Sequence, residues 1–539
     1  MDSPEIDDGT NVVIVPSRAR RHGMTYPAAL PASTSDLLET RLPAESHPET
    51  FSPLAPPRDP RVPGSDRLRR LLPGGCRRQM VELGLLFIAC AYGVGAAVGL
   101  PLYGDGAYYF FRIVVDGTPD IPNFRYAAVL PQLPTLAATW LSADINLLRH
   151  CFSLTYAALP VLSLLGCWMV AQRRAPALML FPALFFTLNQ INFSAVSELL
   201  LCLYLAWPYV LLAGLYPRHP ATWCYGAALA PLLLLLHPLA FGLALFLAVA
   251  AVITARSVGD PQRVRRAWSV IAAGLALSGM LRLAWTLIGS NSYERSFADA
   301  SQVGYYLLPT TPGQVALMLA VCAVVLIPLR SRGTGRSTGT WLVWLLPVLA
   351  AWVSAEILAG DGVKLKAALI YPFGLCFMGL ALWAARASTD RHETWGHGSS
   401  RRFARPFAAC VLAIVLLTLA KSAAWWTATR GLINATASAD GTCLVFGPQA
   451  PYDLQWPWMA IIDNWTAPIA ALVFRGPWPI PLLLPKDGCT LLRQTGTAYL
   501  TAWTGRPESL LATRFGPLRQ SHGECAGEPG CLEPVGHRQ

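Results

Sequence analysis

The residues best suited to chemistry lie in the stretch 103–125, which holds three carboxylates, two arginines and several aromatic side chains. Asp105 stands in a Gly-Asp-Gly-Ala-Tyr-Tyr run, where the flanking glycines allow the backbone to approach a ligand closely. A carboxylate there could act as a general base on a hydroxyl group or bind a divalent cation. The structural alternative is an aspartate that caps the next helix. Asp116 and Asp120 fit ordinary turn chemistry.

The chain around this stretch has the composition of a membrane protein. Of its 539 residues, 54% are hydrophobic and only 14% are charged, whereas a soluble protein has about 25% charged residues. The formal net charge of +11 indicates basic cytoplasmic loops. Because no RNA- or DNA-binding motif is present, we expect no nucleic-acid partner.

The pattern of apolar runs predicts an all-α polytopic membrane protein with about eleven transmembrane helices, since about 20 apolar residues cross the hydrocarbon. Residues 126–141, broken by Pro131 and Pro134, are predicted as a short interfacial helix. The expected spans are 80–102, 150–171, 176–191, 197–216, 222–236, 239–256, 268–289, 313–330, 341–358, 366–385 and 406–426. The run 224–256 is divided because proline in His237–Pro238 disfavours a continuous helix.

Positive charge sets the expected orientation of the spans. Basic residues cluster before the first span and in alternate loops, so the N-terminus is expected in the cytoplasm and the C-terminus outside. We expect three parts: a disordered basic cytoplasmic tail (1–78), a transmembrane bundle (79–427) whose first outer loop is the acidic stretch 103–125, and a small extracytoplasmic α+β domain (428–539). The composition, rich in Ala, Leu and Arg, favours the inner (plasma) membrane of a bacterium.

The C-terminal part contains four cysteines, which are Cys443, Cys489, Cys525 and Cys531. Cysteines in an outward-facing segment suggest disulfides formed in an oxidising compartment. Cys443–Cys489 with Cys525–Cys531 is the simplest of the three possible pairings. No CxxC or His/Cys cluster indicates a metal site, so a metal requirement stays open.

Several ionisable residues on the expected outer side are candidates for substrate binding, because charge in or beside a span is costly. Arg282, inside a predicted span, needs a carboxylate, a phosphate or a water-filled cavity, and a structural pair is equally compatible. Arg295, Lys364 and Lys366 could hold a lipid phosphate, while a solvated arginine and lysines extended to the interface are the plain alternatives. His237 is either a hydrogen-bonded structural residue or a contact to the substrate head group.

The acidic outer loop after the first span, the many apolar helices and the outward C-terminal domain together resemble the GT-C superfamily of integral-membrane glycosyltransferases. The Gly-Asp-Gly-Ala-Tyr-Tyr run is similar to the acidic motif in that superfamily's first outer loop, and the architectural likeness covers roughly 80–430. The resemblance implies a polyprenyl-phosphate-linked sugar donor and transfer on the outer face, with Asp105 as the catalytic carboxylate. This run lacks the Asp-Asp or Glu-Asp doublet found in many members of that superfamily.

Three other functions remain open. A transporter or flippase of a lipid-linked or small substrate would have ionisable residues near the bilayer midplane and often paired repeats. A polysaccharide polymerase or ligase would use the same lipid-linked substrates. A non-enzymatic membrane scaffold would tolerate replacement of Asp105.

Overall fold

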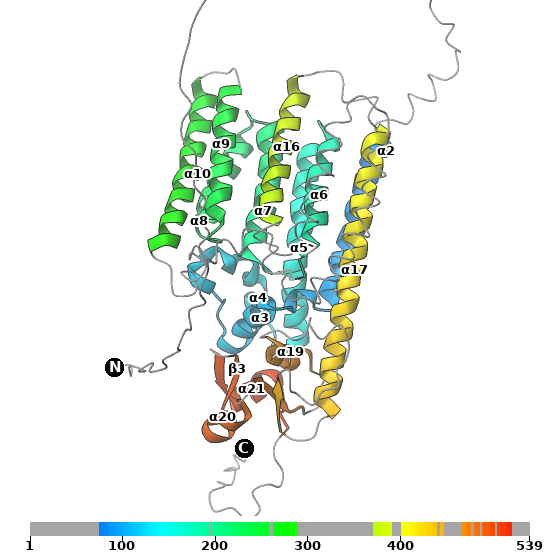
Figure 1. Ribbon diagram of the computed structural model, residues 1–539, viewed down its shortest axis with the longest axis vertical. Helices are drawn as coiled ribbons and strands as arrows, with labels where there is room; N and C mark the ends of the chain where they lie inside the picture. Colours follow the sequence, from blue (N-terminus) through cyan, green and yellow to red (C-terminus); the bar gives the residue numbers. More distant parts are fainter. Residues whose placement is uncertain are drawn as a thin grey trace, which may run out of the picture. The chain divides into compact units, whose positions relative to one another are not determined.

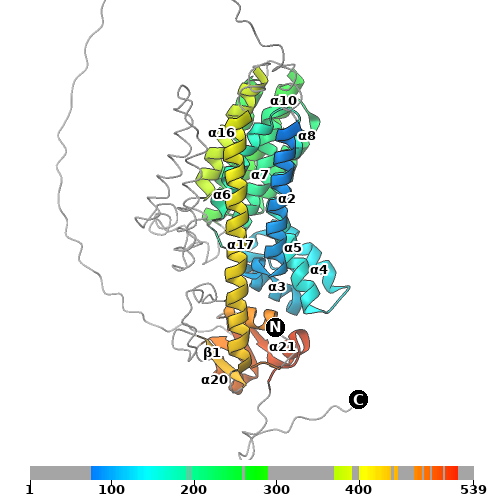
Figure 2. The same ribbon diagram turned by 90° about the vertical axis from the view of Figure 1, so that its right-hand side faces the viewer.

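The helices of this chain follow its apolar runs. A computed structural model describes residues 75–190, 192–193, 196–257, 262–288, 370–390, 400–438, 442–446, 466–475, 479–485, 488–501 and 504–519, all within one compact unit, Gly64–Gln539. The longer helices are α2 (Gly75–Ala97), α5 (Ile145–Ala171), α6 (Leu180–Asn189), α7 (Glu198–Leu215), α8 (Pro220–Leu234), α9 (Ala240–Ser257), α10 (Gln262–Ile288), α16 (Tyr371–Asp390) and α17 (Ser400–Ser438). They run alongside one another, with α2 and α17 adjacent (Figures 1 and 2).

Five of the described helices are long and apolar enough to cross a membrane. They contain the segments Arg78–Ala97, Ile145–Ala171, Glu198–Leu215, Gln262–Ile288 and Phe403–Ser438. Three further apolar helical segments are shorter: Pro176–Asn189, Pro220–Leu234 and Ala240–Arg256. The prediction of a helical protein with apolar, membrane-compatible spans is therefore confirmed for the described residues.

Several of these helices expose large apolar side chains. Exposed residues include Leu86 and Phe87 on α2, Leu154 and Met169 on α5, and Val270 on α10. A water-soluble protein seldom leaves contiguous apolar surface of this kind uncovered. The exposed faces are consistent with contact to lipid.

The predicted helix break at His237–Pro238 is confirmed. Helix α8 ends at Leu234 and α9 begins at Ala240. The backbone N–H of Leu239 donates to Nδ1 of His237 at 3.1 Å, so the imidazole satisfies one of the donors left free where a helix begins.

Helix α17 is much longer than the span predicted at 406–426. It has 39 residues, which at a rise of 1.5 Å per residue gives about 58 Å, against a hydrocarbon thickness of about 30 Å. Its last turns contribute Trp425, Ala428 and Leu432 to a hydrophobic core shared with the C-terminal part. The helix therefore continues past the boundary expected at 427 because those turns have their own apolar partners.

Short elements connect α2 to α5, and two of them, α3 and η2, lie within the acidic stretch 103–125. They are η1 (Leu100–Leu102), α3 (Asp105–Asp116), η2 (Pro122–Phe124), η3 (Tyr126–Gln132) and α4 (Leu133–Thr139). A further short turn of helix, η4 (Pro176–Met179), leads into α6. The short helix expected at 126–141 is thus present as η3 and α4.

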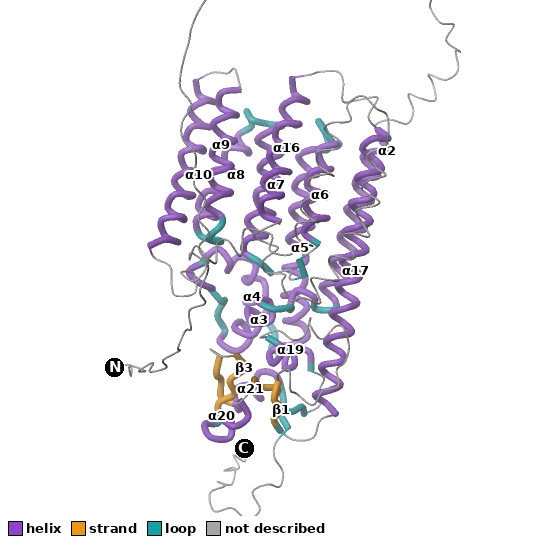
Figure 3. The backbone as a smooth tube through the Cα atoms, in the orientation of Figure 1, coloured by secondary structure: helices purple, strands orange, loops and turns teal. Residues whose placement is uncertain are grey.

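The C-terminal part combines short helices and strands, as the α+β prediction required. Its elements are β1 (Cys443–Phe446), α19 (Ala467–Phe474), β2 (Leu482–Pro485), α20 (Gly488–Thr495), β3 (Thr497–Thr501), β4 (Thr504–Pro507) and α21 (Glu508–Phe515). Strands β1 and β2 pair in parallel, from Cys443 opposite Leu482 to Phe446 opposite Pro485. Strands β3 and β4 form an antiparallel pair with an irregularity between Tyr499 and Thr501. Figure 3 shows these strands beside α20 and α21.

Two hydrophobic cores organise the described residues. The larger lies among the bundle helices and includes Trp207 and Trp268. The second joins α3, the first half of α5 and the end of α17 to α19, β2 and α21. The acidic stretch and the C-terminal part thus share one core.

Some of the predictions lie outside the described residues. They are the expected spans 313–330 and 341–358 and the tail 1–78 up to residue 74.

Candidate functional site

Asp105 is the first residue of α3 and is partly buried. The residue before it, Gly104, has a φ of 59°, a backbone conformation that favours glycine. The helix ends at Gly117, which has a φ of 67° and donates its N–H to the carbonyl of Ile113. At the N-terminus of α3 the helix dipole stabilises the negative charge of Asp105. The N-cap position itself belongs to Gly104, so Asp105 is the first helical residue and not the capping aspartate of the structural alternative.

A buried ion pair lies beside Asp105. The carboxylate of Glu198, at the start of α7, accepts from Arg125 Nη1 at 3.0 Å and from the hydroxyl of Tyr109. Burial raises the pKa of Tyr109 well above its usual value, and the charges of Glu198 and Asp105 act in the same direction while Arg125 opposes them. Burial also raises the pKa of Tyr103, again assisted by Asp105. Both carboxylates thus lie close to the Tyr109 hydroxyl.

Asp120 belongs to the same group of carboxylates. Burial raises its pKa to about 6, and the negative charges of Glu198, Asp105 and Asp116 contribute, whereas Arg112 opposes the rise. The side chain of Gln132 holds the backbone of Asp120, accepting from its N–H and donating to its carbonyl, both at 2.8 Å. A carboxyl group that titrates near neutral pH is suited to proton transfer.

Asp116 has a different set of partners. It accepts from Arg506 Nη2 at 2.8 Å and 2.9 Å and from Arg506 Nε at 3.1 Å, and it pairs with Arg112 Nη1 at 2.8 Å. Arg112 Nε also lies 3.5 Å from Asp120. Phe111 stacks on Phe515 at 5.9 Å between ring centroids. Asp116 therefore attaches α3 to β4 of the C-terminal part, a role that its turn-like sequence context did not indicate.

Two of the candidates for substrate binding, Arg282 of α10 and His237 between α8 and α9, lie within the described residues. Arg282 is 1% exposed, and its guanidinium stands 5.7 Å from the ring centroid of Trp285. The Cys202 side chain, on α7, is within electrostatic reach of both Glu198 and Arg282 and hydrogen-bonds to the backbone of His237. These contacts bring Arg282 and His237 to the same side of α7 as the acidic group. Arg295, Lys364 and Lys366 lie outside the described residues.

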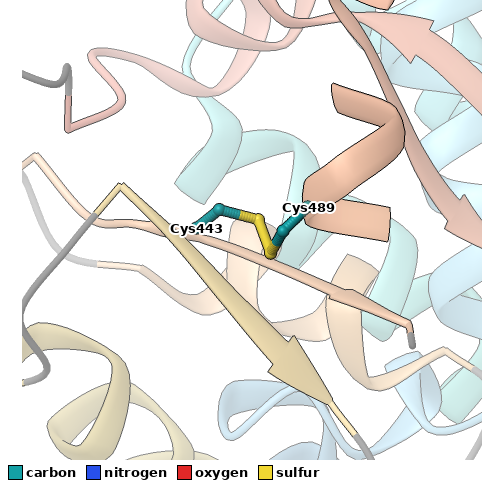
Figure 4. The surroundings of a disulfide bond; sticks show 2 residues. All are labelled: Cys443 and Cys489. Atoms are coloured by element: carbon teal, nitrogen blue, oxygen red, sulfur yellow. A yellow bond between two sulfur atoms is a disulfide. The ribbon is translucent and has the colours of Figure 1, made fainter. Parts of the chain in front are cut away.

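Cys443 and Cys489 form a disulfide that joins the start of β1 to the start of α20 (Figure 4). The two Cα atoms are 5.7 Å apart, and 46 positions separate the residues in the sequence. This is one of the two pairs in the simplest expected arrangement. Cys525 and Cys531 lie outside the described residues.

Lys421 is a buried cation that the sequence analysis did not single out. It lies in α17, is 6% exposed, and donates from Nζ to the backbone carbonyl of Asn192 at 3.2 Å. The signal was available, since a lysine inside an apolar span is costly. Its contact with Asn192 could not be predicted, because the two residues are 229 positions apart in the sequence and meet only in the folded protein.

Metal binding by the acidic group finds no support in the described part of the chain. No set of three or more His, Cys, Asp or Glu side chains there is arranged to hold a metal ion. Asp105 lies at the N-terminus of α3, the Asp120 carboxylate pairs with Arg112, and the Glu198 carboxylate pairs with Arg125.

The chain was compared with family models, curated proteins and solved structures. No family model, curated protein or solved structure matches it.

Proposed function

We propose that this protein is a membrane glycosyltransferase that moves a sugar from a polyprenyl-phosphate-linked donor to an acceptor hydroxyl on the outer face of the membrane. The observation that carries the proposal is the acidic group of Asp105, Asp120 and Glu198, partly buried beside membrane-compatible helices that also bear Arg282. A carboxylate of this kind can accept a proton, and a buried arginine can bind a phosphate.

In the proposed reaction, Asp105 accepts the proton of the acceptor hydroxyl as its oxygen attacks the anomeric carbon of the sugar. The bond between that carbon and the donor phosphate oxygen breaks, and its electron pair remains on the lipid phosphate. Fixed cations lower the free energy of the charge that develops on the leaving group. We assign this role to Arg282, with Arg295, Lys364 and Lys366 as further candidates. His237, whose imidazole caps α9, is the remaining candidate contact to the head group.

The proposal includes an orientation in the membrane. About eleven spans would place the N-terminus in the cytoplasm and the acidic stretch with the C-terminal part outside, in the inner membrane of a bacterium. The shared core of α3 with the C-terminal part supports one feature of this arrangement, because both must then lie on the same side of the membrane.

The test is Asp105→Asn in the native host, read by protein level in the membrane and by the glycans and glycolipids of the cell envelope. Asparagine keeps the size of the side chain but accepts no proton, so we expect a normal protein level with the glycan defect of a deletion strain. Glu82→Gln is the matched control, since this exposed carboxylate pairs only with Arg78 among the described residues. Loss of a general base lowers rates roughly 100- to 10,000-fold.

Two results would contradict the proposal. Wild-type glycans in a stable Asp105→Asn strain, where the deletion alters them, would remove Asp105 from the mechanism. Unchanged glycans in the deletion strain itself would remove glycosyl transfer altogether.

A transporter or flippase is the second candidate, and the buried cations within spanning helices favour it. Arg282 and Lys421 are 1% and 6% exposed on α10 and α17. Intramembrane cations commonly mark a substrate or ion pathway. Transport of a labelled substrate into vesicles by the Asp105→Asn protein at the wild-type rate would support this function over transfer. A scaffold would show neither activity and would tolerate the substitution.

A further inference from the structure

A small polar cavity surrounds Lys421 inside the bundle. Its volume is about 30 Å³, room for about two water-sized groups. It lies between α2, η1, α5, the end of α6, α7 and α17. The lining side chains that carry polar groups are Tyr92, Tyr156, Asn189, Asn192, Tyr204, Thr418 and Lys421.

Most polar groups of this lining can donate a hydrogen bond, and the buried Oδ1 of Asn189 is an acceptor without a partner among the described residues. Tyr92 and Tyr204 accept from Gln190 Nε2 and Asn189 Nδ2, both at 2.8 Å, so their own O–H groups remain available to donate. The Tyr156 hydroxyl makes no hydrogen bond to the described residues, and its ring packs on Phe152. Lys421 carries three N–H donors and uses one on Asn192.

The charge of Lys421 lacks a counterion within the described part of the chain. No carboxylate there lies within ion-pair distance of Nζ, and the carbonyl of Asn192 is its one polar contact among those residues. An ammonium group in a protein interior is costly unless an anion or several acceptors compensate it. Donors in excess and a buried positive charge together match an oxyanion.

We infer that the cavity around Lys421 is a binding site for an oxyanion of the phosphate class. The Lys421 ammonium would pair with the anion, and the hydroxyls of Tyr92, Tyr156 and Tyr204 would donate to its oxygens. The volume admits two of the oxygens. The inference concerns binding alone, so it holds whether or not the protein transfers a sugar.

The surroundings of the cavity link it to the acidic group. Leu100 and Pro101 of η1 line it, and Gly106 of α3 packs directly on the Pro101 carbonyl, where an added Cβ would come within 1.8 Å of the oxygen. Tyr156 is also within electrostatic reach of Asp105, Asp120 and Glu198. Tyr156 and η1 therefore lie between the cavity and the acidic group.

The experiment measures binding to the full-length protein purified in detergent, by the shift in thermal unfolding with increasing ligand. The probes are inorganic phosphate and a polyprenyl phosphate, with the uncharged polyprenol as control. We expect one or both phosphates to stabilise the wild type. Lys421→Met should weaken that binding roughly tenfold or more, because a charge-assisted hydrogen bond is lost. Arg430→Met, which removes an exposed cation from the same helix, should change it by less than about twofold.

Tyr156→Phe provides a second variant, since it removes one donor and no hydrogen bond within the described residues. It should weaken binding by a factor of about 3 to 10. Stabilisation by the polyprenyl phosphate alone would identify a lipid head group as the ligand, and stabilisation by inorganic phosphate alone a soluble anion. The inference is overturned if neither probe stabilises the wild type, or if Lys421→Met and Tyr156→Phe bind as tightly as Arg430→Met. Sugar transfer is tested separately, by the cell-envelope glycans of the Asp105→Asn strain.

Discussion

Glu198 joins parts of the chain that are distant in sequence. It opens α7, accepts from Tyr109 of α3 and pairs with Arg125 beyond η2. Its negative charge at a helix N-terminus is favourable, and the arginine compensates for burial at 6% exposure. Asp120 lies 3.5 Å from Arg112 Nε, a longer ion pair than the one that Glu198 makes with Arg125. Glu198 and Asp120 therefore differ in how closely an arginine approaches them.

At the scale of single residues, Asp120 predicts a pH dependence of folding. Because burial raises its pKa in the folded state from 3.8 to about 6, the folded protein binds this proton more tightly than the unfolded chain. Its stabilising contribution is present below about pH 4 and is lost as the pH rises through about 6. Asp120→Asn should therefore gain about 1–3 kcal/mol in free energy of unfolding relative to wild type between about pH 4 and pH 7.

Chemical denaturation of the detergent-solubilised protein at the two pH values measures this difference. Glu82→Gln serves as control, because that exposed carboxylate is outside the acidic group. An equal change for Asp120→Asn and Glu82→Gln would show that Asp120 is not the group responsible.

At the scale of elements, the bidentate Asp116–Arg506 pair attaches β4 to α3. Its side chains are about one-fifth exposed, so water screens the pair only partly. We expect Asp116→Asn and Arg506→Met each to destabilise the C-terminal part, with a coupling free energy of about 1 kcal/mol in a double-mutant cycle. The measurement is the rate of limited proteolysis of the C-terminal part, which should rise in both variants. Strictly additive single and double variants would mean that the pair contributes nothing to docking.

The close approach of α3 to η1 gives another prediction for elements. A Cβ on Gly106 would lie 1.8 Å from the Pro101 carbonyl and 3.0 Å from Val196, so Gly106→Ala must move backbone. We expect a loss of about 3 kcal/mol or more. Gly93→Ala is the control, since the helical Gly93 has open space around it and alanine favours helix. Comparable thermal stability of the two variants would contradict this packing.

The sequence was informative about elements and less so about their contacts. Apolar runs and Pro238 predicted the helices and the break between α8 and α9, and the α+β character expected of the C-terminal part is present in its short helices and strands. Asp116 with Arg506 and Lys421 with Asn192 were not predicted. Each pair is brought together by tertiary packing across hundreds of residues, for which local periodicity carries no signal.

At the scale of the whole molecule, the Cys443–Cys489 disulfide bears on orientation. Disulfides persist in oxidising compartments, which agrees with an extracytoplasmic C-terminal part. A reporter enzyme that folds only outside the cytoplasm, fused after Gln539, should therefore be active, and the same reporter fused before the first span should be inactive. Activity confined to the N-terminal fusion would reverse the proposed orientation.

Helix α17 runs from Phe403 in the bundle core to Leu432 in the second core and carries Lys421 between them. The proline that it contains, Pro406, lies well before Lys421, so the portion from the ammonium group to the second core is uninterrupted helix. A continuous helix of this kind rotates and shifts as a rigid body. An anion that draws Lys421 towards it would turn Trp425, one helical turn further on, against Phe474 and Tyr103. Binding of an anion at Lys421 inside the bundle would thus alter the packing of Trp425 in the second core.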